Sequence, residues 1–383
     1  MAAVERVSDL IWGEGPFFTL PATWFTDPAI FRREKETIFY KSWRYAGHES
    51  DLPKSGSFVT CRVVDQEIFL IRNRKGAVNA FYNVCQHRAH ELLKGSGRIK
   101  AVITCPYHAW TYDPDGRLKT ARHCNEVAGF DKADFGLEPV RVETMLGLIF
   151  VNLDPDAPSL AATYPGLAEE IRSLVPDFDR LTKVRDRRAR AADNTAELLK
   201  SNWKVLMDNC SECYHCAPAH PDFVDLVDME SYRITVHDTY TRHEMTSTKP
   251  VNAAYAYAPD APAKGGVFWH LWPNMTLGVM PGSANFSVFT FEPVDVETTR
   301  LGGDDFRLPG GETDLDAART RYTAEVLWPE DRGICESVQR GLHSRGYTRG
   351  RFMIDRERGP ISEHVPYHFH RKVAQALDEV LEP

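Results

Sequence analysis

Two short segments of the chain each pair one cysteine with one histidine. Cys85 and His87 form the first pair, Cys105 and His108 form the second, and seventeen residues lie between His87 and Cys105. Two thiolates and two imidazoles can hold a tetrahedral zinc ion, or a [2Fe–2S] cluster with cysteines on one iron and histidines on the other. Zinc motifs usually pair Cys with Cys and His with His along the chain. One residue of each kind per segment therefore favours a cluster with two unlike irons.

A second group of ligand-type side chains follows in the middle of the chain. On a continuous helix, Asp208, Glu212 and His215 would share one face, because they are spaced i, i+4 and i+7. His220 would lie about 140° round that helix from His215, but Pro218 is expected to end the helix and let His220 fold back. Two imidazoles and one carboxylate from elsewhere would form the facial triad of non-haem Fe(II) sites, which leaves positions open for O₂.

Two other interpretations of this segment remain open. Cys210, Cys213, Cys216 and His220 are spaced as in a bacterial [4Fe–4S] run, with histidine in place of the fourth cysteine. Such runs usually occupy a glycine-rich loop, whereas this segment has helical spacing. The cysteines could equally be small core residues and the histidines ordinary buried side chains.

The carboxylate that would complete the triad is expected near residue 330. Asp331 is our candidate for the third ligand, and Glu330 beside it is the alternative. Asp331 also stands where the N-cap of a helix over 333–343 would stand, so a purely structural role is a competing hypothesis.

The elements that must position these side chains change character along the chain. Asp27 followed by Pro28 is typical of a helix start, so 1–43 is expected to be an N-terminal helical segment that packs on the last domain. Over 44–154, short β-branched and aromatic runs alternate with polar turns, which predicts a small antiparallel all-β domain around the Cys–His pairs. A proline-rich stretch marks its end.

The remaining residues, 155–383, combine strands with separate helices and predict an α+β domain. Helical spacing predicts a helix over 195–215 and another over 333–343, and strands joined by short turns are expected within 268–291. The glycine-containing segment 302–314 is expected to be a loop.

Composition excludes several classes of protein. With 383 residues, 43% hydrophobic and 26% charged, the chain has the length and make-up of about two packed domains. A net charge of −8 and no basic run argue against nucleic-acid binding. No apolar run reaches the ~18–20 residues of a membrane span, and the acidic N-terminus does not resemble a signal peptide. We therefore expect a cytoplasmic location and cysteines that serve as metal ligands or core residues rather than disulfides.

Together, the two constellations resemble the α-subunits of Rieske non-haem iron oxygenases over nearly the whole chain. The Cys–His pairs match the Rieske motif C-x-H-(15 to 17)-C-x-x-H, and the match extends to Arg88 and Trp110. Neither loop has the extra cysteine of respiratory-chain Rieske proteins. The resemblance implies a Rieske [2Fe–2S] domain at 44–154 and a helix-grip catalytic domain at 155–383.

The resemblance also implies roles for individual residues. The cluster would be held by Cys85, His87, Cys105 and His108, and one Fe(II) per subunit by His215, His220 and Asp331. Glu212 would link His108 of one subunit to His215 of its neighbour in a head-to-tail homotrimer. Electrons from NAD(P)H would arrive through a separate flavin- or ferredoxin-type reductase, because the sequence has no glycine-rich nucleotide-binding loop.

The segments NWKVLMDNCSECYHCAPAHP and GICESVQRGL look most like the group that acts on quaternary ammonium compounds, namely choline and carnitine monooxygenases and betaine demethylases. The implied function is O₂-dependent hydroxylation or N-demethylation of a small methylated ammonium compound. An aromatic-ring hydroxylating dioxygenase is the alternative, and a Rieske electron carrier or redox sensor is an alternative from another class.

Aromatic residues are dense over 268–291, and they offer a possible site for such a cation. An ammonium group binds well on aromatic faces, with ~0.5–2 kcal/mol per contact, and a box of this kind should lie beside His215 and His220. Alternating aromatics also simply fill sheet cores, so no individual residue is assigned to the substrate. The aromatics concerned are Phe268, Trp269, Trp272, Phe286, Phe289 and Phe291.

Overall fold

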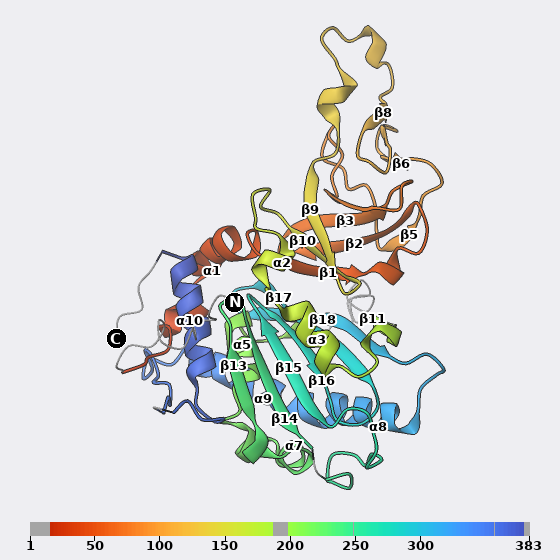
Figure 1. The fold of residues 1–383 in the computed structure, drawn as a ribbon. Coiled ribbons are helices and arrows are strands. Elements are labelled where there is room, and N and C mark those ends of the chain that lie inside the picture. Colours follow the sequence, from red (N-terminus) through yellow and green to blue (C-terminus); the bar gives the residue numbers. More distant parts are fainter. Residues whose placement is uncertain (1–15, 187–197, 248, 356, 379–383) are drawn as a thin grey trace, which may run out of the picture. The chain divides into compact units, whose positions relative to one another are not determined.

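The computed structural model describes residues 16–186, 198–247, 249–355 and 357–378 (Figure 1). The chain divides into two compact units. The smaller unit is Phe39–Thr163, and the larger one combines the described residues before and after it.

The smaller unit is built almost entirely of antiparallel strands. Its main sheet has seven strands, and a second sheet of three short strands carries the segment around the second Cys–His pair. In sheet order the strands are β1 (Arg44–His48), β10 (Leu148–Asn152), β9 (Pro139–Met145), β4 (Val78–Tyr82), β3 (Gln66–Arg72), β2 (Ser57–Val63) and β5 (Ser96–Arg98), then β6 (Ile103–Thr104), β7 (Thr111–Tyr112) and β8 (Leu118–Thr120). Helix α2 (Leu160–Thr163) ends the unit.

Strand β3 is buried on both faces, which explains its uninterrupted apolar sequence. Ile68 and Leu70 pack into one core cluster, whereas Phe69 and Ile71 point to the opposite face and enter another. That second cluster also contains the cysteines of the two Cys–His pairs. The core of the smaller unit therefore supports the loops that carry the candidate ligands.

The described part of the larger unit has one antiparallel sheet, and Figure 1 shows its strands side by side. In sheet order they are β11 (Thr182–Asp186), β18 (Thr298–Arg307), β17 (Asn285–Asp295), β16 (Met275–Val279), β15 (Gly265–Leu271), β14 (Tyr240–Thr246) and β13 (Arg233–Val236), and β12 (Leu198–Leu199) also pairs with β18. The helices are α1 (Pro28–Glu34), α3 (Leu167–Leu174), α5 (Trp203–Cys210), α6 (Cys216–Ala219), α7 (Pro221–Leu226), α8 (Asp314–Tyr322), α9 (Trp328–Gly341) and α10 (His364–Ala376).

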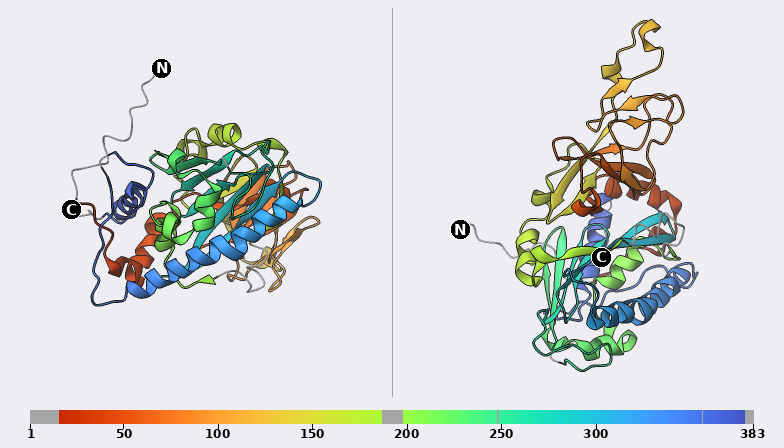
Figure 2. Two further views of the ribbon diagram at one scale, coloured as in Figure 1. Left: turned by 90° about the horizontal axis from the view of Figure 1, so that it is seen from below. Right: turned by 90° about the vertical axis from the view of Figure 1, so that its right-hand side faces the viewer.

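Helices α8 and α9 are joined by a π-helical turn, η9 (Thr323–Leu327), into one long rod. Figure 2 shows this rod running along one face of the large sheet. A helix gripped by a curved antiparallel sheet is the arrangement implied by the sequence resemblance, so the expected α+β fold with an all-β domain is confirmed.

Several sequence-based element predictions are confirmed and others are wrong. The strands expected within 268–291 are β15, β16 and β17. Residues 195–197 of the helix expected over 195–215 lie outside the described residues, and in the remainder the helix is shorter. Helix α5 begins after Asn202, whose side chain accepts from Lys204 N–H at 2.9 Å, and it ends at Cys210. The segment 302–314 is not all loop, because it begins inside β18.

Gly303 lies inside β18, in the part of 302–314 that was expected to be a loop. Gly303 has φ +125°, and a Cβ there would lie 1.8 Å from the carbonyl oxygen of Val288 on β17. Glycine is therefore required by the close approach of two strands and does not mark the start of a loop.

A buried ion pair joins the N-terminal helix to α5. Lys204 Nζ lies 2.5 Å from Glu34 Oε1, and both side chains are fully buried. Trp203 Nε1–H donates to the other oxygen of Glu34 at 2.9 Å. Burial lowers the pKa of Lys204, and the charge of Glu34 opposes that shift. Each charge is thus tolerated only because the other is present.

Removing one partner of this pair should be more damaging than removing both. We expect Glu34→Ala to reduce the free energy of unfolding by about 3–5 kcal/mol, because it leaves the Lys204 ammonium buried and unpaired. Combining it with Lys204→Met should recover part of that loss. Urea denaturation followed by tryptophan fluorescence measures the difference. Asp179→Ala, which breaks the exposed Arg172–Asp179 pair, is the control and should cost less than about 1 kcal/mol. Equal losses of unfolding free energy in Glu34→Ala and Asp179→Ala would contradict this account.

Candidate metal centres and the pocket beside them

The two Cys–His loops of the smaller unit have the same backbone design. In the first loop the N–H of Ala89 donates to the carbonyl of Cys85 at 3.0 Å, and in the second the N–H of Ala109 donates to the carbonyl of Cys105 at 3.0 Å. Both alanines adopt the left-handed conformation, with φ of 56° and 58°. Two like turns thus present their cysteine and histidine in equivalent ways.

The two histidines of these loops lie close together. The rings of His87 and His108 are 4.7 Å apart and meet edge to face, and His87 also stacks on Trp110 at 4.7 Å. Nδ1 of His108 is buried and has no hydrogen-bond partner in the part of the chain that the structure describes. An orphaned imidazole nitrogen of this kind is costly unless another ligand, such as a metal, binds it.

The two cysteines complete a donor set that fits a [2Fe–2S] cluster. Cys85 and Cys105 are each 2% exposed, on the core side of the loops. The hydroxyl of Tyr112 lies 3.3 Å from Cys85 Sγ and accepts the N–H of Gln86 at 3.1 Å, so its own proton is free to point at the sulfur. Two buried sulfurs, one with a hydrogen-bond donor, and two outer imidazoles match the ligands of a cluster with unlike irons.

In the larger unit, three side chains from distant parts of the sequence converge. Ligand atoms of His215, His220 and Asp331 all lie within 4.8 Å of one another. Asp331 Oδ1 is 3.0 Å from Nε2 of His220 and 3.6 Å from Nε2 of His215. Both imidazoles therefore turn the same nitrogen toward one point, as a facial triad requires.

A carboxylate holds the other nitrogen of each imidazole. Nδ1 of His220 is 2.8 Å from Oε2 of Glu330, and Nδ1 of His215 makes a short contact with Oε1 of Glu212. Carboxylates in this position fix the ring orientation and the tautomer of metal-binding histidines. Glu330, the alternative to Asp331 as third ligand, thus lies behind His220 rather than in front of it.

The local backbone explains how these residues meet, and it differs from the sequence prediction. Glu212 lies beyond the end of α5, so it does not share a helix face with Asp208. Its side chain instead accepts the N–H of His215, three residues further along the chain, at 3.2 Å. The single turn α6 contains Pro218 and brings His220 to the start of α7. Asp331 lies inside α9, not at its N-cap, so the structural hypothesis for this residue is wrong.

The cysteines of this segment do not form a cluster site. Cys213 and Cys216 are joined by a disulfide, and the thiol of Cys210 lies 3.7 Å from the hydroxyl of Thr276. The [4Fe–4S] interpretation is therefore wrong, and so is the expectation that the cysteines would form no disulfide.

The electrostatics of the triad favour positive charge. Burial by itself would lower the pKa of His215, but hydrogen bonds to Asp331 and Glu212 raise it to about 9. Burial likewise opposes ionisation of Asp331, yet both histidines hold the pKa of Asp331 below its usual value. Such a site binds protons when nothing else is present, and a divalent cation can take their place. The donor set therefore fits the mononuclear iron of a non-haem oxygenase.

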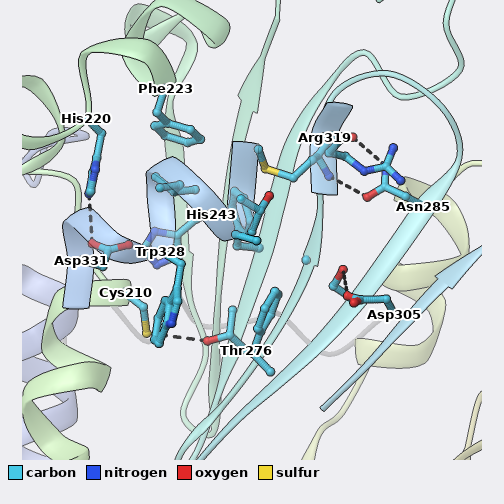
Figure 3. A pocket seen from close by; sticks show the side chains of 18 of the residues that line it. Cys210, His220, Phe223, His243, Thr276, Asn285, Asp305, Arg319, Trp328 and Asp331 are labelled. Atoms are coloured by element: carbon cyan, nitrogen blue, oxygen red, sulfur yellow. Dashed lines mark hydrogen bonds and ion pairs between the residues drawn. The ribbon is translucent and has the colours of Figure 1, made fainter. Parts of the chain in front are cut away.

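The triad lies at one end of a cavity of about 360 Å³ between the sheet and the α8–α9 rod. Figure 3 shows His220, Asp331, Cys210 and Trp328 on one side of it, and Arg319, Asn285 and Asp305 on the other. The rod lines the cavity with residues at helical spacing: Asp316, Arg319, Thr320, Thr323, Ala324, Leu327, Trp328 and Asp331. The volume suits a small organic ligand.

Cross-strand neighbours form the opposite wall. One row runs from His270 to Thr276 and Phe289, and the next from His243 to Phe268, Gly278, Ser287 and Asp305. Gly278 leaves room for the ring of Phe268, which would lie 2.9 Å from a Cβ there. All of these residues line the cavity. Neither histidine was predicted from the sequence, because His243 lies between Arg242 and Glu244, His270 lies between Trp269 and Leu271, and no motif spacing connects the two.

The dense aromatics divide between the two faces of the sheet. Phe268, Phe289 and Phe291 line the cavity. Trp269 points away, and its Nε1–H donates to Glu170 at 3.2 Å, while Phe286 is a core residue 1% exposed. Aromatic residues therefore line part of the cavity, as expected, whereas Trp269 and Phe286 on the same strands do not face it.

Comparison with known proteins places this architecture in a family. Residues 42–131 match the model of the Rieske [2Fe-2S] domain, and 178–379 match that of the ring hydroxylating alpha subunit (catalytic domain). The chain belongs to the Rieske non-haem iron oxygenases, as an α subunit with a [2Fe–2S] cluster in the first domain and a mononuclear iron in the second. It is an enzyme, so the electron-carrier alternative is wrong.

Within the family, the chain is similar to proteins that oxidise quaternary ammonium compounds. It is 40% identical to the carnitine monooxygenase oxygenase subunit of Escherichia coli K12, over 94% of each chain. It is 39% identical to the protein of the same name from Acinetobacter baumannii, over 98% of this chain and 99% of that one. The solved structure of the quaternary ammonium Rieske monooxygenase CntA with L-carnitine superposes with a TM-score of 0.82 at 37% identity, covering 94% of this chain and 95% of the other.

None of the helices in the described ranges combines the length and apolar character that a membrane span requires.

Proposed function

We propose that the chain is the oxygenase subunit of a two-component monooxygenase that hydroxylates a carbon next to the nitrogen of carnitine or a closely related quaternary ammonium compound. The observation that carries the proposal is the His215–His220–Asp331 group at the end of a cavity with an aromatic wall. The 40% identity to carnitine monooxygenase subunits over 94% of the chain supports the substrate class.

The proposal assigns a role to each predicted site residue. Cys85, His87, Cys105 and His108 hold the [2Fe–2S] cluster in a Rieske domain over 44–154. His215, His220 and Asp331 hold the mononuclear iron in a catalytic domain over 155–383. The N-terminal segment 1–43 is proposed to pack on that domain, and residues 1–15 of the segment lie outside the described residues. When bound, the two centres supply the electron storage and O₂ activation of this family.

The protein residues around the mononuclear site orient ligands and hold charge. Glu330 and Glu212 each bind the Nδ1 side of one imidazole, so both Nε2 atoms face inward. Glu212 has a second proposed role as the link to His108 of a neighbouring subunit in a homotrimer. Its contact with His215 provides one half of such a bridge within this chain.

The cavity suits a cation better than an anion at the iron end. The carboxylates of Asp331, Glu212 and Glu330 lie there, against His215 and His220. Arg319 lies at the far end beside Asn285 (Figure 3), and Arg307 is the cross-strand neighbour of Asn285. Phe291 and Trp328 lie 6.4 Å apart with nearly parallel rings, and aromatic faces of this kind attract an ammonium group that has no hydrogen to donate.

The reaction consumes one O₂ and two electrons from NAD(P)H, delivered by a separate flavin- or ferredoxin-type reductase, and also yields water. Hydroxylation of an N-methyl carbon gives a carbinolamine that breaks its C–N bond to release formaldehyde and a demethylated amine. Hydroxylation of the chain methylene beside nitrogen releases trimethylamine and an aldehyde instead. Because the electron supply is an NAD(P)H pool, a cytoplasmic location remains part of the proposal.

Turnover with a panel of compounds tests the function. We expect the iron-loaded protein with a matched reductase to oxidise carnitine, γ-butyrobetaine, glycine betaine or choline, with the highest kcat/KM among the methylated amines. Formaldehyde, trimethylamine and O₂ consumption are measured together. A cis-diol from naphthalene or benzoate, with no amine consumed, would overturn the proposal and favour the ring-hydroxylating alternative.

The two neighbouring acidic residues should behave differently when altered. We expect Asp331→Ala to lose the mononuclear iron while the visible spectrum of the cluster stays intact, because one of three ligands is missing. Glu330→Gln should keep most of the iron, since its amide oxygen can still accept a hydrogen bond from His220. Metal analysis of both purified variants decides the assignment, and iron loss in Glu330→Gln alone would reverse it.

Glu212→Gln separates electron transfer from metal binding. The amide keeps an acceptor for His215, so we expect both iron centres to remain while NADH-coupled turnover falls at least tenfold. Single-turnover product formation from a pre-reduced cluster measures the step directly. Loss of the mononuclear iron in this variant would instead make Glu212 a ligand.

A further inference from the structure

One histidine on the cavity wall, His270, has a ring nitrogen that can form a hydrogen bond with a ligand. His270 on β15 is 7% exposed and lines the cavity. Its Nδ1 is 3.0 Å from the hydroxyl of Thr276, its direct cross-strand neighbour on β16. Its Nε2 has no hydrogen-bond partner among the described residues. This nitrogen is also not among the fully buried polar atoms that lack a partner.

The neighbouring histidine is a useful contrast. The rings of His243 and His270 meet edge to face at 4.6 Å. Both nitrogens of His243 are occupied, Nδ1 by the hydroxyl of Tyr232 at 2.5 Å and Nε2 by that of Thr241 at 3.2 Å. His243 is therefore a fixed part of the wall, and of these two histidines it is His270 that can bind a ligand in the cavity.

His270 is held as a neutral imidazole. Burial lowers the pKa of His270 to about 3 and that of His243 well below its ordinary value. A neutral ring beside the site does not repel a cationic substrate. One of its nitrogens carries a proton and the other a lone pair, so its partners decide what Nε2 presents.

A short chain of hydroxyl and thiol groups favours a proton on Nε2. Burial raises the pKa of Cys210 to about 12, so its sulfur keeps a proton. The thiol can donate to the carbonyl of Met207 at 3.6 Å or to the Thr276 oxygen at 3.7 Å. Thr276 can donate to Nδ1 of His270, its nearest hydrogen-bond partner at 3.0 Å. With Nδ1 accepting, Nε2–H points a donor into the cavity.

The same series of side chains connects this donor to the candidate iron site. Cys210 follows Asn209, whose amide nitrogen is 3.4 Å from Nε2 of His215. His270 is therefore connected to the triad through Thr276 and the end of α5. Arg319 is a poor alternative for a small substrate, because it lies twelve residues before Asp331 on the rod, about 18 Å at 1.5 Å per residue, and pairs with Asp316 in the opposite direction.

We infer that Nε2–H of His270 binds the oxygen-bearing end of the substrate, a carboxylate or hydroxyl, and so fixes which C–H next to nitrogen faces the triad. The inference rests on the proposed function and deepens it: the preferred substrates are quaternary ammonium compounds that carry an oxygen acceptor. His270 is then a specificity-determining residue, and Thr276 positions it.

A pair of probes with and without oxygen acceptors tests this role. Carnitine and butyltrimethylammonium have the same trimethylammonium group and four-carbon chain, but the second has no oxygen. Isothermal titration calorimetry on the iron-loaded protein measures both affinities. We expect His270→Phe to weaken carnitine binding about 10- to 100-fold, as for loss of a hydrogen bond to a charged group, and to change butyltrimethylammonium binding less than about threefold. His270→Gln, which keeps an N–H near the position of Nε2, should restore most of the preference for carnitine.

Two threonine variants provide the matched comparison. Thr276→Val removes the hydroxyl on His270 and should reduce the preference for carnitine about three- to tenfold, as for a neutral hydrogen bond. Thr241→Val removes the equivalent hydroxyl on His243 and should leave the preference unchanged. Turnover adds a second readout, because loss of the anchor should change the ratio of trimethylamine to formaldehyde.

Several results would overturn the inference. They are an equal loss for both probes in His270→Phe, no loss for either, or an unchanged carnitine preference in Thr276→Val if His270→Phe does not fold. If the unaltered protein oxidises no methylated amine, the proposed function itself fails. Oxidation of carnitine by the unaltered protein, with equal losses for both probes in His270→Phe, rejects this inference alone.

Discussion

Two adjacent carboxylates that bind one imidazole set the arrangement of the larger unit. Glu330 and Asp331 occupy a single turn of α9, and they reach the two nitrogens of His220 at 2.8 and 3.0 Å. His220 is only 2% exposed and comes from a loop more than a hundred residues earlier. Because the ring is held from both sides, the position of α9 against the segment after α5 is set at this point. The same contact fixes where a metal ion can bind and where the cavity must begin.

The rod that carries this acidic pair also forms the cavity. From Asp316 to Asp331 its inner face advances by three or four residues at a time, through the π-helical turn, and faces the cross-strand rows of β14 to β18. Glycines make those rows deep enough: Gly278 lies under the ring of Phe268, and Gly303 lets β18 approach β17. Packing and chemistry are thus served by the same elements, since each strand presents one face to the core and the other to the substrate.

The parts of the site that the sequence revealed are those whose ligands lie close together along the chain. Each Cys–His pair sits in one tight turn, so residue type and spacing were sufficient to predict the cluster. The two histidines of the second site were predictable for the same reason. The end of α5 at Cys210 was not, because the helical spacing of Asp208, Glu212 and His215 continues past it into the turn where Glu212 accepts the N–H of His215. Asp331 could be named from the sequence only as one of two neighbouring acidic candidates, because it lies far from the histidines along the chain, and its N-cap alternative was excluded by where α9 begins. His270 gave no local signal, because its role depends on a cross-strand threonine and on a cavity assembled from five strands and a helix.

The distribution of charge in the cavity links its chemistry to its substrate. Three carboxylates surround two imidazoles at the triad end of the cavity, where their charge would balance that of an iron and of a cationic group nearby. The middle of the cavity is kept neutral, because burial suppresses protonation of His243 and His270. An aromatic hydrocarbon would need neither the carboxylates nor a free imidazole N–H and would leave that donor unsatisfied, at a cost of about 1–3 kcal/mol. A molecule with a methylated ammonium at one end and an oxygen acceptor at the other satisfies both, so selectivity arises from polar groups that the wrong substrate cannot pair.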